Sequence, residues 1–447
     1  MKKIKKALAI LLVVFIVLGP ISVIVFNIDI SDDENNSNIE KEEESWRGVI
    51  RMWDFPRLDT TTGSRYGWIE NKIKRFEAKN PGVFIELTPI DWNKGPIKLE
   101  VGLETGNLPD IAPVGTDFLY MNDKTLEPLD SYFEDSEIKE FKDLAIKAVK
   151  NDGKTWGVPF MMTTYGVYIN LDLFKEKDIE PPKDGNWTYD EFVEIAKKLT
   201  FDSDNDGKID QYGFHSFIKP NYYNLWGMIL SDDGKIVNEK DKSYTFYDKQ
   251  AISGVEKIVD LKNKHKVTPE DFGTSNENKA WDMFSKEKKV AIYPAGSWGV
   301  KVLENLDKNG EGFDFTVVNY PTGDSGKPTS LNNSISAYGV FKQKDKQKLD
   351  TIVKFLKFLV EDETQKELEK LGVFSVKNNI DEMYADNEHM KRIEESLKHT
   401  QTIPKHPKWK EMDRILQNQI RLAVIKEKTS KEALEEAKSQ IEQILSN

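Results

Sequence analysis

The sequence contains no cysteine, so it has no disulfide bond, no thiolate nucleophile and no thiol for lipid attachment. Its five histidines are scattered, and no two of them have the spacing of a metal site. HExxH, P-loop and GxSxG motifs are also absent. The abundant carboxylates leave a glycoside hydrolase open. On these absences we expect a protein that is not an enzyme and holds no organic cofactor.

The chain also lacks a basic stripe. It carries 64 Lys and Arg against 76 Asp and Glu, a net charge of −12, which argues against nucleic acid as a partner. Its 447 residues are enough for two or three domains with their own cores. Aromatic residues are plentiful, with 10 Trp, 15 Tyr and 23 Phe. Most Phe belong in a core, whereas several Trp lie among polar neighbours, a pattern typical of sugar-facing surfaces.

The N-terminus predicts export. Lysines at positions 2, 3, 5 and 6 precede an uncharged apolar run over 7–26, which is long enough to span a bilayer. The run lacks the short core and the A-x-A-like exit of a cleaved signal peptide. We therefore predict a signal anchor or transmembrane helix over 1–28 that keeps the lysines cytoplasmic and exports the remainder, with cleavage and release as the alternative. Residues 29–45 are acidic and predict a disordered tether.

Hydrophobic periodicity predicts an α/β protein. GVIRMWDF (48–55) and VFIELTPI (83–90) have strand patterns, and residues 66–79 between them have helical spacing. This order is typical of a right-handed parallel crossover. Thr188 and Glu191 form a capping box before a second helix. Further strands are expected over 290–299 and 334–341, and charged helices are expected from residue 406.

The stretch 153–170, GKTWGVPFMMTTYGVYIN, predicts a strand that passes from one packed body to another. Its threonine pair, Thr163 and Thr164, and Gly166 are small or backbone-polar residues of the kind that a hinge requires. We expect residue 162 to begin a second lobe and the strand at 334–341 to return the chain to the first.

Seven segments then resemble a known family in their order and spacing over some 400 residues. The chain resembles family 1 of the extracellular solute-binding proteins, the carbohydrate-binding subunits of ABC importers, and is similar to the maltose-binding protein. The segments are FEAKNPGVFIEL (76–87), GNLPDI (106–111), LEPLDSYF (126–133), the stretch 153–170, WTYDEFVEIAKKL (187–199), FSKEKKVAIYPAGSW (284–298) and LGVFSVKNN (371–379).

The resemblance implies an α/β, two-lobe periplasmic-binding-protein-like fold (type II), in which each lobe is a mixed sheet flanked by helices. Lobe 1 would comprise 46–161 and 337–384, and lobe 2 would comprise 162–336 and 385–447. It also implies a monomer that captures an oligosaccharide between its lobes by hinge closure on the outer face of the membrane and delivers it to a permease. A binder that serves a sensor kinase, or a carbohydrate-active enzyme, remains open as an alternative.

Candidate ligand residues are aromatic rings that can stack on sugars and polar groups that can bond hydroxyls. Trp298 follows a strand beside two glycines and, like Trp409, aligns with a stacking tryptophan of the family. One of Tyr222, Tyr223 and Trp226 is expected to contact ligand, and the others to pack in the core. The remaining candidates lie at predicted strand ends or on the crossing strand, with surface or packing roles as their alternatives: Trp53, Asp54, Trp92, Asp117 and Tyr165.

An acidic loop over 202–210, DSDNDGKID, has the spacing of the first part of an EF-hand. Position 12, where an EF-hand carries a bidentate Glu, is Gly213, so the loop is not an EF-hand. Clustered aspartates repel one another without a cation. We therefore expect a structural Ca²⁺ away from the cleft, with a solvated acidic turn as the alternative. Its expected ligands are Asp202, Asp204, Asp206, Lys208 through its carbonyl oxygen, and Asp210.

Overall fold

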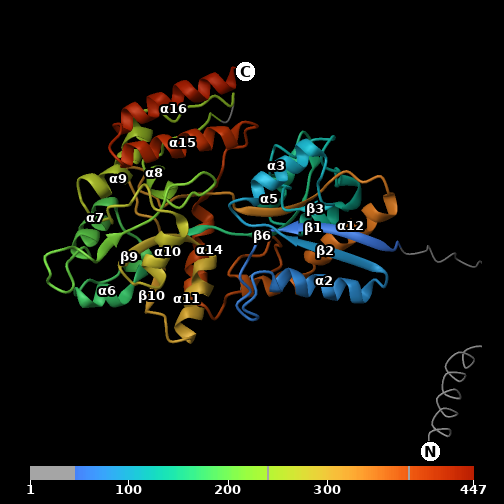
Figure 1. The fold of residues 1–447 in the computed structure, drawn as a ribbon, viewed down its shortest axis with the longest axis horizontal. Helices are drawn as coiled ribbons and strands as arrows, with labels where there is room; N and C mark the ends of the chain where they lie inside the picture. The colour runs from blue at the N-terminus through green and yellow to red at the C-terminus, as the bar shows by residue number, and fades with distance from the viewer. Residues whose placement is uncertain (1–45, 239–240, 381–382, 447) are drawn as a thin grey trace, which may run out of the picture. The chain divides into compact units, whose positions relative to one another are not determined.

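The computed structural model describes residues 46–238, 241–380 and 383–446. The predicted anchor and tether, at 1–28 and 29–45, lie outside the described residues. Within the described ranges no helix combines the length and the apolar character needed to cross a bilayer. The described chain builds two larger sheets, each with its own helices (Figure 1).

The first sheet has the strand order β2-β1-β3-β12-β6. Its strands are β1 (Gly48–Asp54), β2 (Val83–Pro89), β3 (Ile111–Ala112), β6 (Val158–Met162) and β12 (Ile335–Val340). β1 pairs with β2 and β3 in parallel, whereas β12 pairs antiparallel with β3 and β6, so the sheet is mixed. The strand, helix and strand predicted over 48–90 are confirmed as a parallel unit.

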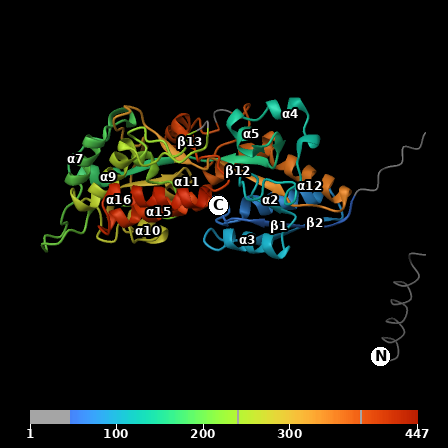
Figure 2. The same cartoon turned by 90° about the horizontal axis from the view of Figure 1, so that it is seen from above.

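Helices cover both faces of this sheet. In both views α2 and α3 lie on opposite sides of β1 and β2 (Figures 1 and 2). α2 buries Trp68, Ile69, Ile73 and Phe76, which recur at helical spacing. The helical elements of this lobe are α2 (Gly67–Lys79), α3 (Gly95–Thr105), η1 (Asp130–Tyr132), α4 (Asp135–Lys139), α5 (Asp143–Val149), α12 (Lys346–Leu359), α13 (Asp362–Lys366) and η3 (Glu367–Leu371).

The second sheet has the order β10-β7-β9-β8 and is also mixed, because β7 pairs antiparallel with β9 and β10 while β8 and β9 are parallel. Its strands are β7 (Tyr165–Asn170), β8 (Tyr212–Phe214), β9 (Val290–Gly296) and β10 (Phe315–Val318). A separate pair, β11 (Ser330–Asn332) and β13 (Thr400–Thr402), joins distant parts of the chain. A hairpin of β4 (Lys150–Asn151) and β5 (Lys154–Thr155) precedes β6.

The helices of the second lobe include an α15–α16 pair that packs side by side (Figures 1 and 2). The capping box predicted at Thr188 and Glu191 is confirmed at the start of α7. The helical elements are α6 (Leu171–Glu176), η2 (Lys183–Gly185), α7 (Tyr189–Lys198), α8 (Trp226–Ile229), α9 (Lys249–Asn263), α10 (Glu277–Ser285), α11 (Trp298–Lys308), α14 (Glu388–Ser396), η4 (Leu397–His399), α15 (Trp409–Val424) and α16 (Ser430–Leu445).

The stretch 153–170 is not one strand. β6 ends at Met162 in the first sheet, β7 begins at Tyr165 in the second, and Thr163 and Thr164 form the junction. Gly166 is not part of the junction. It lies inside β7, where a Cβ would approach Val317 Cγ1 at 2.7 Å, so its small size serves packing.

Side-chain hydroxyls fix the junction to two segments of the second lobe. The Thr163 hydroxyl lies 2.9 Å from that of Ser297, and the Thr164 hydroxyl lies 2.6 Å from that of Thr400. The second crossing runs beside the first, since Thr163 N–H donates to the Ser334 carbonyl at 2.9 Å. Four segments far apart in the sequence therefore meet where the two sheets adjoin.

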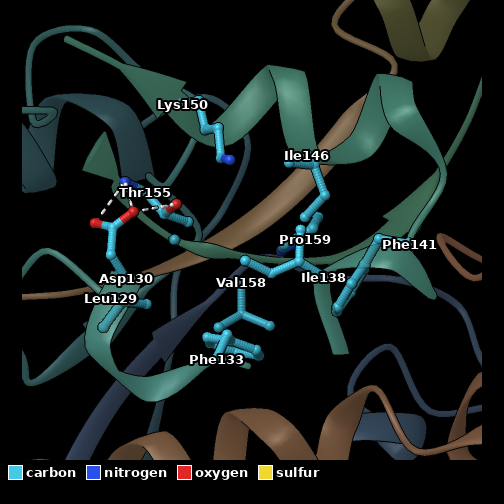
Figure 3. Close-up of a pocket in the computed structure, with 11 residues that line it drawn as sticks. Leu129, Asp130, Phe133, Ile138, Phe141, Ile146, Lys150, Thr155, Val158 and Pro159 are labelled. Atoms are coloured by element: carbon cyan, nitrogen blue, oxygen red, sulfur yellow. Dashed lines mark hydrogen bonds between the residues drawn. The ribbon is translucent and has the colours of Figure 1, made fainter. Parts of the chain in front are cut away.

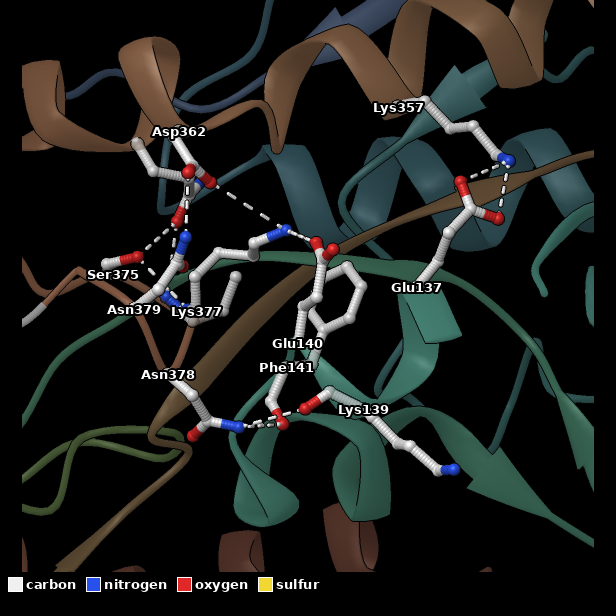
Figure 4. A network of polar contacts seen from close by, with 12 residues as sticks. Glu137, Lys139, Glu140, Phe141, Lys357, Asp362, Ser375, Lys377, Asn378 and Asn379 are labelled. Carbon is white, nitrogen blue, oxygen red and sulfur yellow. Dashed lines mark hydrogen bonds and ion pairs between the residues drawn. The ribbon is translucent and has the colours of Figure 1, made fainter. Parts of the chain in front are cut away.

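A polar network holds residues 375–379 on the first lobe before the chain passes to α14 (Figure 4). The buried Lys377 ammonium contacts the Glu140 carboxylate, and Asn378 Nδ2 donates to the Phe141 carbonyl at 2.9 Å. Ser375 bonds to buried Gln365 at 2.8 Å. This anchoring fixes residues 375–379 to the first lobe.

Candidate functional site

Two of the ten tryptophans are exposed, one on each lobe. Trp298 is 39% exposed at the start of α11, directly after β9. Its indole lies over Gly296, where a Cβ would come within 2.6 Å of the indole nitrogen, so only glycine leaves room for the ring. Trp281 on α10 supports it edge-on at 4.9 Å between ring centroids. The predicted Trp298 thus presents an aromatic face beside the junction, because Gly296 pairs with Tyr165.

α10 continues this surface toward the loop that precedes α8. Glu277 lies one helical turn before Trp281, on the same side of α10. Lys219 Nζ lies 3.7 Å from the Glu277 carboxylate and 4.5 Å from the centre of the Tyr222 ring. Tyr222 is half-buried against Phe217. Burial raises the pKa of its hydroxyl, and the negative charge of Glu277 raises it further. Of the three aromatics predicted here, Tyr222 keeps exposed surface.

Tyr223 and Trp409 form a buried pair behind Tyr222. Tyr223 is 2% exposed and Trp409 is 6% exposed. The Trp409 indole N–H donates to the Tyr223 hydroxyl at 3.1 Å, and the two rings stack at 6.3 Å. Half-buried Tyr165 accepts a long 3.4 Å bond from the Tyr223 backbone N–H. Trp409 therefore packs beneath the surface. The resemblance implied an exposed ring that stacks on ligand, and the structure buries it instead.

Trp226 lies in the core of the second lobe. It is 1% exposed at the start of α8 and packs against Phe246 at 5.5 Å. The packing alternative stated for two of the three aromatics therefore describes Trp226 and Tyr223.

The first lobe contributes the second exposed tryptophan, next to a contact with the second lobe. Trp92 is 46% exposed, with one face stacked on Phe55 at 4.2 Å and its indole N–H bonded to the Pro56 carbonyl at 3.1 Å. The next residue, Asn93, accepts a 2.6 Å bond from Lys219 Nζ of the second lobe. The free face of Trp92 therefore lies beside a point where the two lobes touch.

A second interlobe contact lies further along α3. Lys410, at the start of α15, pairs with Glu100 of the first lobe. Half-buried Asp117 lies near this pair: burial raises the pKa of its carboxyl, and the Lys410 ammonium opposes the shift. Asp117 also accepts the Leu119 backbone N–H at 2.9 Å, which leaves its second oxygen available to a ligand hydroxyl.

Asp54 and Trp53 are less open than the sequence suggested. Asp54 is fully buried, and both of its oxygens lie 2.9 Å from Arg57 Nη1, while the Tyr338 hydroxyl donates to one of them at 3.0 Å. These bonds make Asp54 an anchor for the loop after β1. The half-buried ring of Trp53 is covered by the Lys98 ammonium at 4.2 Å.

Two cavities of the described chain lie apart from this surface. One, of about 10 Å³, is lined by apolar side chains that include Phe133, Ile146 and Val158, with Asp130 bonded to Thr155 at its edge (Figure 3). It has room for about one water molecule. Another, of about 430 Å³, lies between α11, β10 and α14 and is lined by Glu304, Asp307 and His389 among others.

The acidic loop brings three of its predicted ligands together. Oxygens of Asp202, Asp204 and Asp206 all lie within 4.8 Å of one another. The Gly207 N–H donates to Asp202 at 2.6 Å, which closes the loop around this cluster. Asp210 bonds instead to the Ser203 hydroxyl at 2.6 Å, so its carboxylate is turned to the loop backbone. The donor set fits the preference of Ca²⁺ for carboxylate oxygen.

Several residues of the surface were not predicted from the sequence. Trp281 and Glu277 belong to a helix whose apolar positions read as ordinary core, although the capping Asn276 was a usable signal for its start. No local sequence pattern predicts the contacts of Lys219 with Asn93 or of Lys410 with Glu100. Each contact joins segments over a hundred residues apart. Asp413 accepts a hydrogen bond from the turn before α8, and no sequence pattern around it predicts this contact.

The model of the family of bacterial extracellular solute-binding proteins matches residues 72–392. A putative binding protein of Brucella abortus is 30% identical over 154 residues, 34% of this chain and 36% of the relative. The diacetylchitobiose binding protein of Streptomyces coelicolor is 30% identical over 281 residues, 59% of this chain and 55% of the relative. The matches thus span about a third to a half of these relatives.

Solved structures match the fold over more of the chain. An ABC substrate-binding protein of Listeria monocytogenes, solved with cycloalternan, superposes with a TM-score of 0.76 at 20% identity, covering 90% of this chain and 99% of that one. The maltose/maltodextrin-binding domain of Bdellovibrio bacteriovorus, bound to maltotriose, has a TM-score of 0.75 at 18% identity and covers 90% and 100%. Together these structures confirm the predicted two-lobe α/β fold.

Proposed function

Because the chain belongs to the bacterial extracellular solute-binding proteins, we propose that it captures an oligosaccharide between its two lobes and delivers it to the permease of an ABC importer. In this role it is a binding protein without catalytic activity, and it acts as a monomer.

The observation that carries the proposal is the pair of exposed tryptophans. Trp298 on the second lobe and Trp92 on the first each have one face packed and one face open. Flat apolar faces suit the C–H surfaces of sugar rings, and the surrounding polar groups suit hydroxyls. Asp117 and Glu277 supply acceptors, while Lys219 and the Tyr222 hydroxyl supply donors.

The ligands for which similar proteins are named support a saccharide as the ligand class. They include diacetylchitobiose for the Streptomyces coelicolor relative, lactose for a binding protein of Rhizobium radiobacter, and maltotriose for one of Pyrococcus abyssi. These ligands differ in ring chemistry and linkage, so they support the class of ligand and leave the particular sugar to experiment.

Capture follows from the junction at Thr163 and Thr164. A change of backbone angles at a few junction residues opens or closes the lobes without disturbing either sheet. Closure desolvates the sugar between the two walls and forms the Lys219–Asn93 and Lys410–Glu100 contacts at the same time. The ligand thereby stabilises the closed arrangement that a permease recognises.

The test is calorimetric titration of the full-length chain with maltotriose, mannotriose, lactose and diacetylchitobiose, followed by chromatography of the recovered sugar. We expect saturable binding of at least one saccharide and its recovery unchanged. A cleavage product would establish an enzyme, and binding of none would remove the carbohydrate assignment. A thermal-shift screen over further sugars would then identify the preferred length and linkage.

We also propose that residues 7–26 are a retained anchor and that 29–45 tether the protein on the outer face of the membrane. The proposal rests on the lysines before an uncharged run that is long enough to span a bilayer. N-terminal sequencing of the membrane-bound form tests it. A sequence starting at or next to Met1 supports anchoring, whereas a start after residue 26 would indicate cleavage.

For the acidic loop we propose a structural Ca²⁺ held by Asp202, Asp204, Asp206 and the Lys208 carbonyl. The ion would offset the repulsion of three carboxylates in one turn. Chelation should then lower the melting temperature, and added Ca²⁺ should restore it. An unchanged melting temperature after chelation would contradict the proposal.

A further inference from the structure

The turn over 219–223 carries two groups of the candidate site, Lys219 and Tyr222. We propose that Asp413 on α15 is a positioning residue that holds this turn in its ligand-binding geometry. The inference rests on the proposed function, because it assigns a role within the same site.

The turn has a backbone strain that requires an external partner. Asn221 adopts a left-handed φ of 66°, a conformation that is less favourable than the right-handed region for a residue other than glycine. Its N–H donates to the Asp413 carboxylate at 2.6 Å. Asp413 is 0% exposed, so water cannot replace it in this bond.

Three side chains of α15 hold the turn along one helical stripe. Trp409, Asp413 and Gln417 are four residues apart, so they lie on the same face. Gln417 Nε2 donates to the Tyr222 carbonyl at 2.9 Å and lies 3.3 Å from the Asp413 carboxylate. Trp409 bonds the hydroxyl of Tyr223 at 3.1 Å. Asp413 is the central member and the one that bonds the left-handed residue.

A purely packing role does not account for an acidic residue here. A buried carboxyl without a basic partner opposes folding, and among the described residues no Lys, Arg or His forms an ion pair with Asp413. Burial raises the pKa of Asp413 to about 7, although the hydrogen bonds from Asn221 and Gln417 act to lower it. Tyr165 and Tyr223 also lie close enough to Asp413 for its charge to raise the pKa of their hydroxyls further.

The consequence reaches the ligand through the turn. Lys219 Nζ bonds Asn93 of the first lobe at 2.6 Å, and the Tyr222 ring lies beneath the same ammonium at 4.5 Å. Release of Asn221 therefore displaces an aromatic face and an interlobe contact together. The binding cleft would lose both without any change to a residue that touches the sugar.

The experiment compares Asp413→Asn with Asp413→Leu in the full-length chain. Asparagine keeps an oxygen that accepts the Asn221 N–H, whereas leucine removes it at similar volume. We expect Asp413→Asn to bind the panel saccharides within about twofold of the wild type, and Asp413→Leu to weaken binding about tenfold or more. Hydrogen exchange of the peptide containing Asn221 should accelerate in the leucine variant alone.

Two further variants keep the test decisive. Asp232→Asn changes an equally buried carboxyl of the same lobe that contacts Lys257 and Ser253, and it should lower the melting temperature with unchanged affinity. If Asp413→Leu fails to fold, Gln417→Leu removes one bond to the same turn and should weaken binding in the same direction.

The outcomes distinguish the positioning role of Asp413 from the proposed binding of a saccharide. Binding by the wild type together with undiminished binding by Asp413→Leu overturns the positioning role and leaves the proposed function intact. Failure of the wild type to bind any saccharide of the panel overturns the proposed function, and the inference with it.

Discussion

At the scale of single residues, exposure separates the tryptophans that can meet a ligand from those that cannot. Trp298 and Trp92 keep open faces, whereas Trp226 and Trp409 are buried at 1% and 6% exposure. All four were candidates in the sequence, because a tryptophan beside polar residues looks the same whether its ring lies above or below the surface. Burial is set by the packing of distant segments, and local sequence does not record it.

The first prediction concerns Trp298→Ala. Loss of a stacking ring of this kind removes about 1.4 kcal/mol of binding free energy, so saccharide affinity should fall about tenfold. The melting temperature should change little, because the ring is 39% exposed. Phe84→Ala removes a 60% exposed ring on β2 and serves as the matched control in the same titration. Equal affinities for both variants would argue against stacking by Trp298.

A second prediction follows from the carboxyl of Asp413. Its folded-state pKa, about 7, is raised above the ordinary value of 3.8. The folded state therefore holds a proton that the unfolded state releases, and stability is lost as pH rises from about 4 to about 7. The full loss is on the order of 4 kcal/mol.

Asp413→Asn removes this titration. Urea unfolding of the variant at pH 4.5 and pH 7.5 should show a smaller fall in the free energy of unfolding than the wild type shows. Identical pH dependence in the two proteins would contradict the assigned shift.

At the scale of elements, the sequence predicted the parallel unit at 48–90 and the start of α7 because both depend on local patterns. It predicted Thr163 and Thr164 as hinge residues, but it placed them within a single strand and did not predict a break there, since β-branched threonine continues a strand pattern. The break exists because β6 and β7 pair with strands of two different sheets. Gly166 was read as a hinge residue for its size, but that size accommodates Val317 and Ile393.

The third prediction concerns the contact between α2 and η3. Glu367 lies 2.7 Å from the buried Lys72 ammonium and also pairs with Arg75 and Lys370. Burial alone would raise the pKa of Glu367, but its bonds to Lys72 and Lys370 lower it to about 2. Glu367→Gln leaves Lys72 without its anionic partner, so the free energy of unfolding should fall by about 3 kcal/mol.

Chemical denaturation measures the change. Glu363→Gln is the control, because its pair with Lys366 is exposed and contributes little. A Glu367→Gln variant as stable as this control would show that the buried lysine is accommodated without its partner.

At the scale of the whole molecule, the family and the two-lobe fold were within reach of the sequence because the order of many weak segments is informative even where each one is not. The contacts between the lobes could not be predicted from the sequence. Lys219 meets Asn93, and Lys410 meets Glu100, only when the two lobes approach. The same contacts give closure a measurable electrostatic component.

The fourth prediction tests that component with Lys410→Met and Glu100→Gln. The pair is more than a third exposed on both sides, so its net contribution should be about 0.5 kcal/mol. Each single variant and the double variant should weaken saccharide binding about twofold, with little added by the second change. Lys197→Met, which removes a pair within α7, should leave affinity unchanged. Additive effects of the two changes would show that the contact does not form in the bound state.

The central claim is that a saccharide binds between the two lobes and leaves unchanged. Calorimetric titration of the full-length chain and of Trp298→Ala with the four saccharides, followed by chromatography of the recovered sugar, tests it most directly. We expect saturable binding to the wild type, a loss of about tenfold in the variant, and intact sugar. No binding to any saccharide, or a cleaved product, would contradict it.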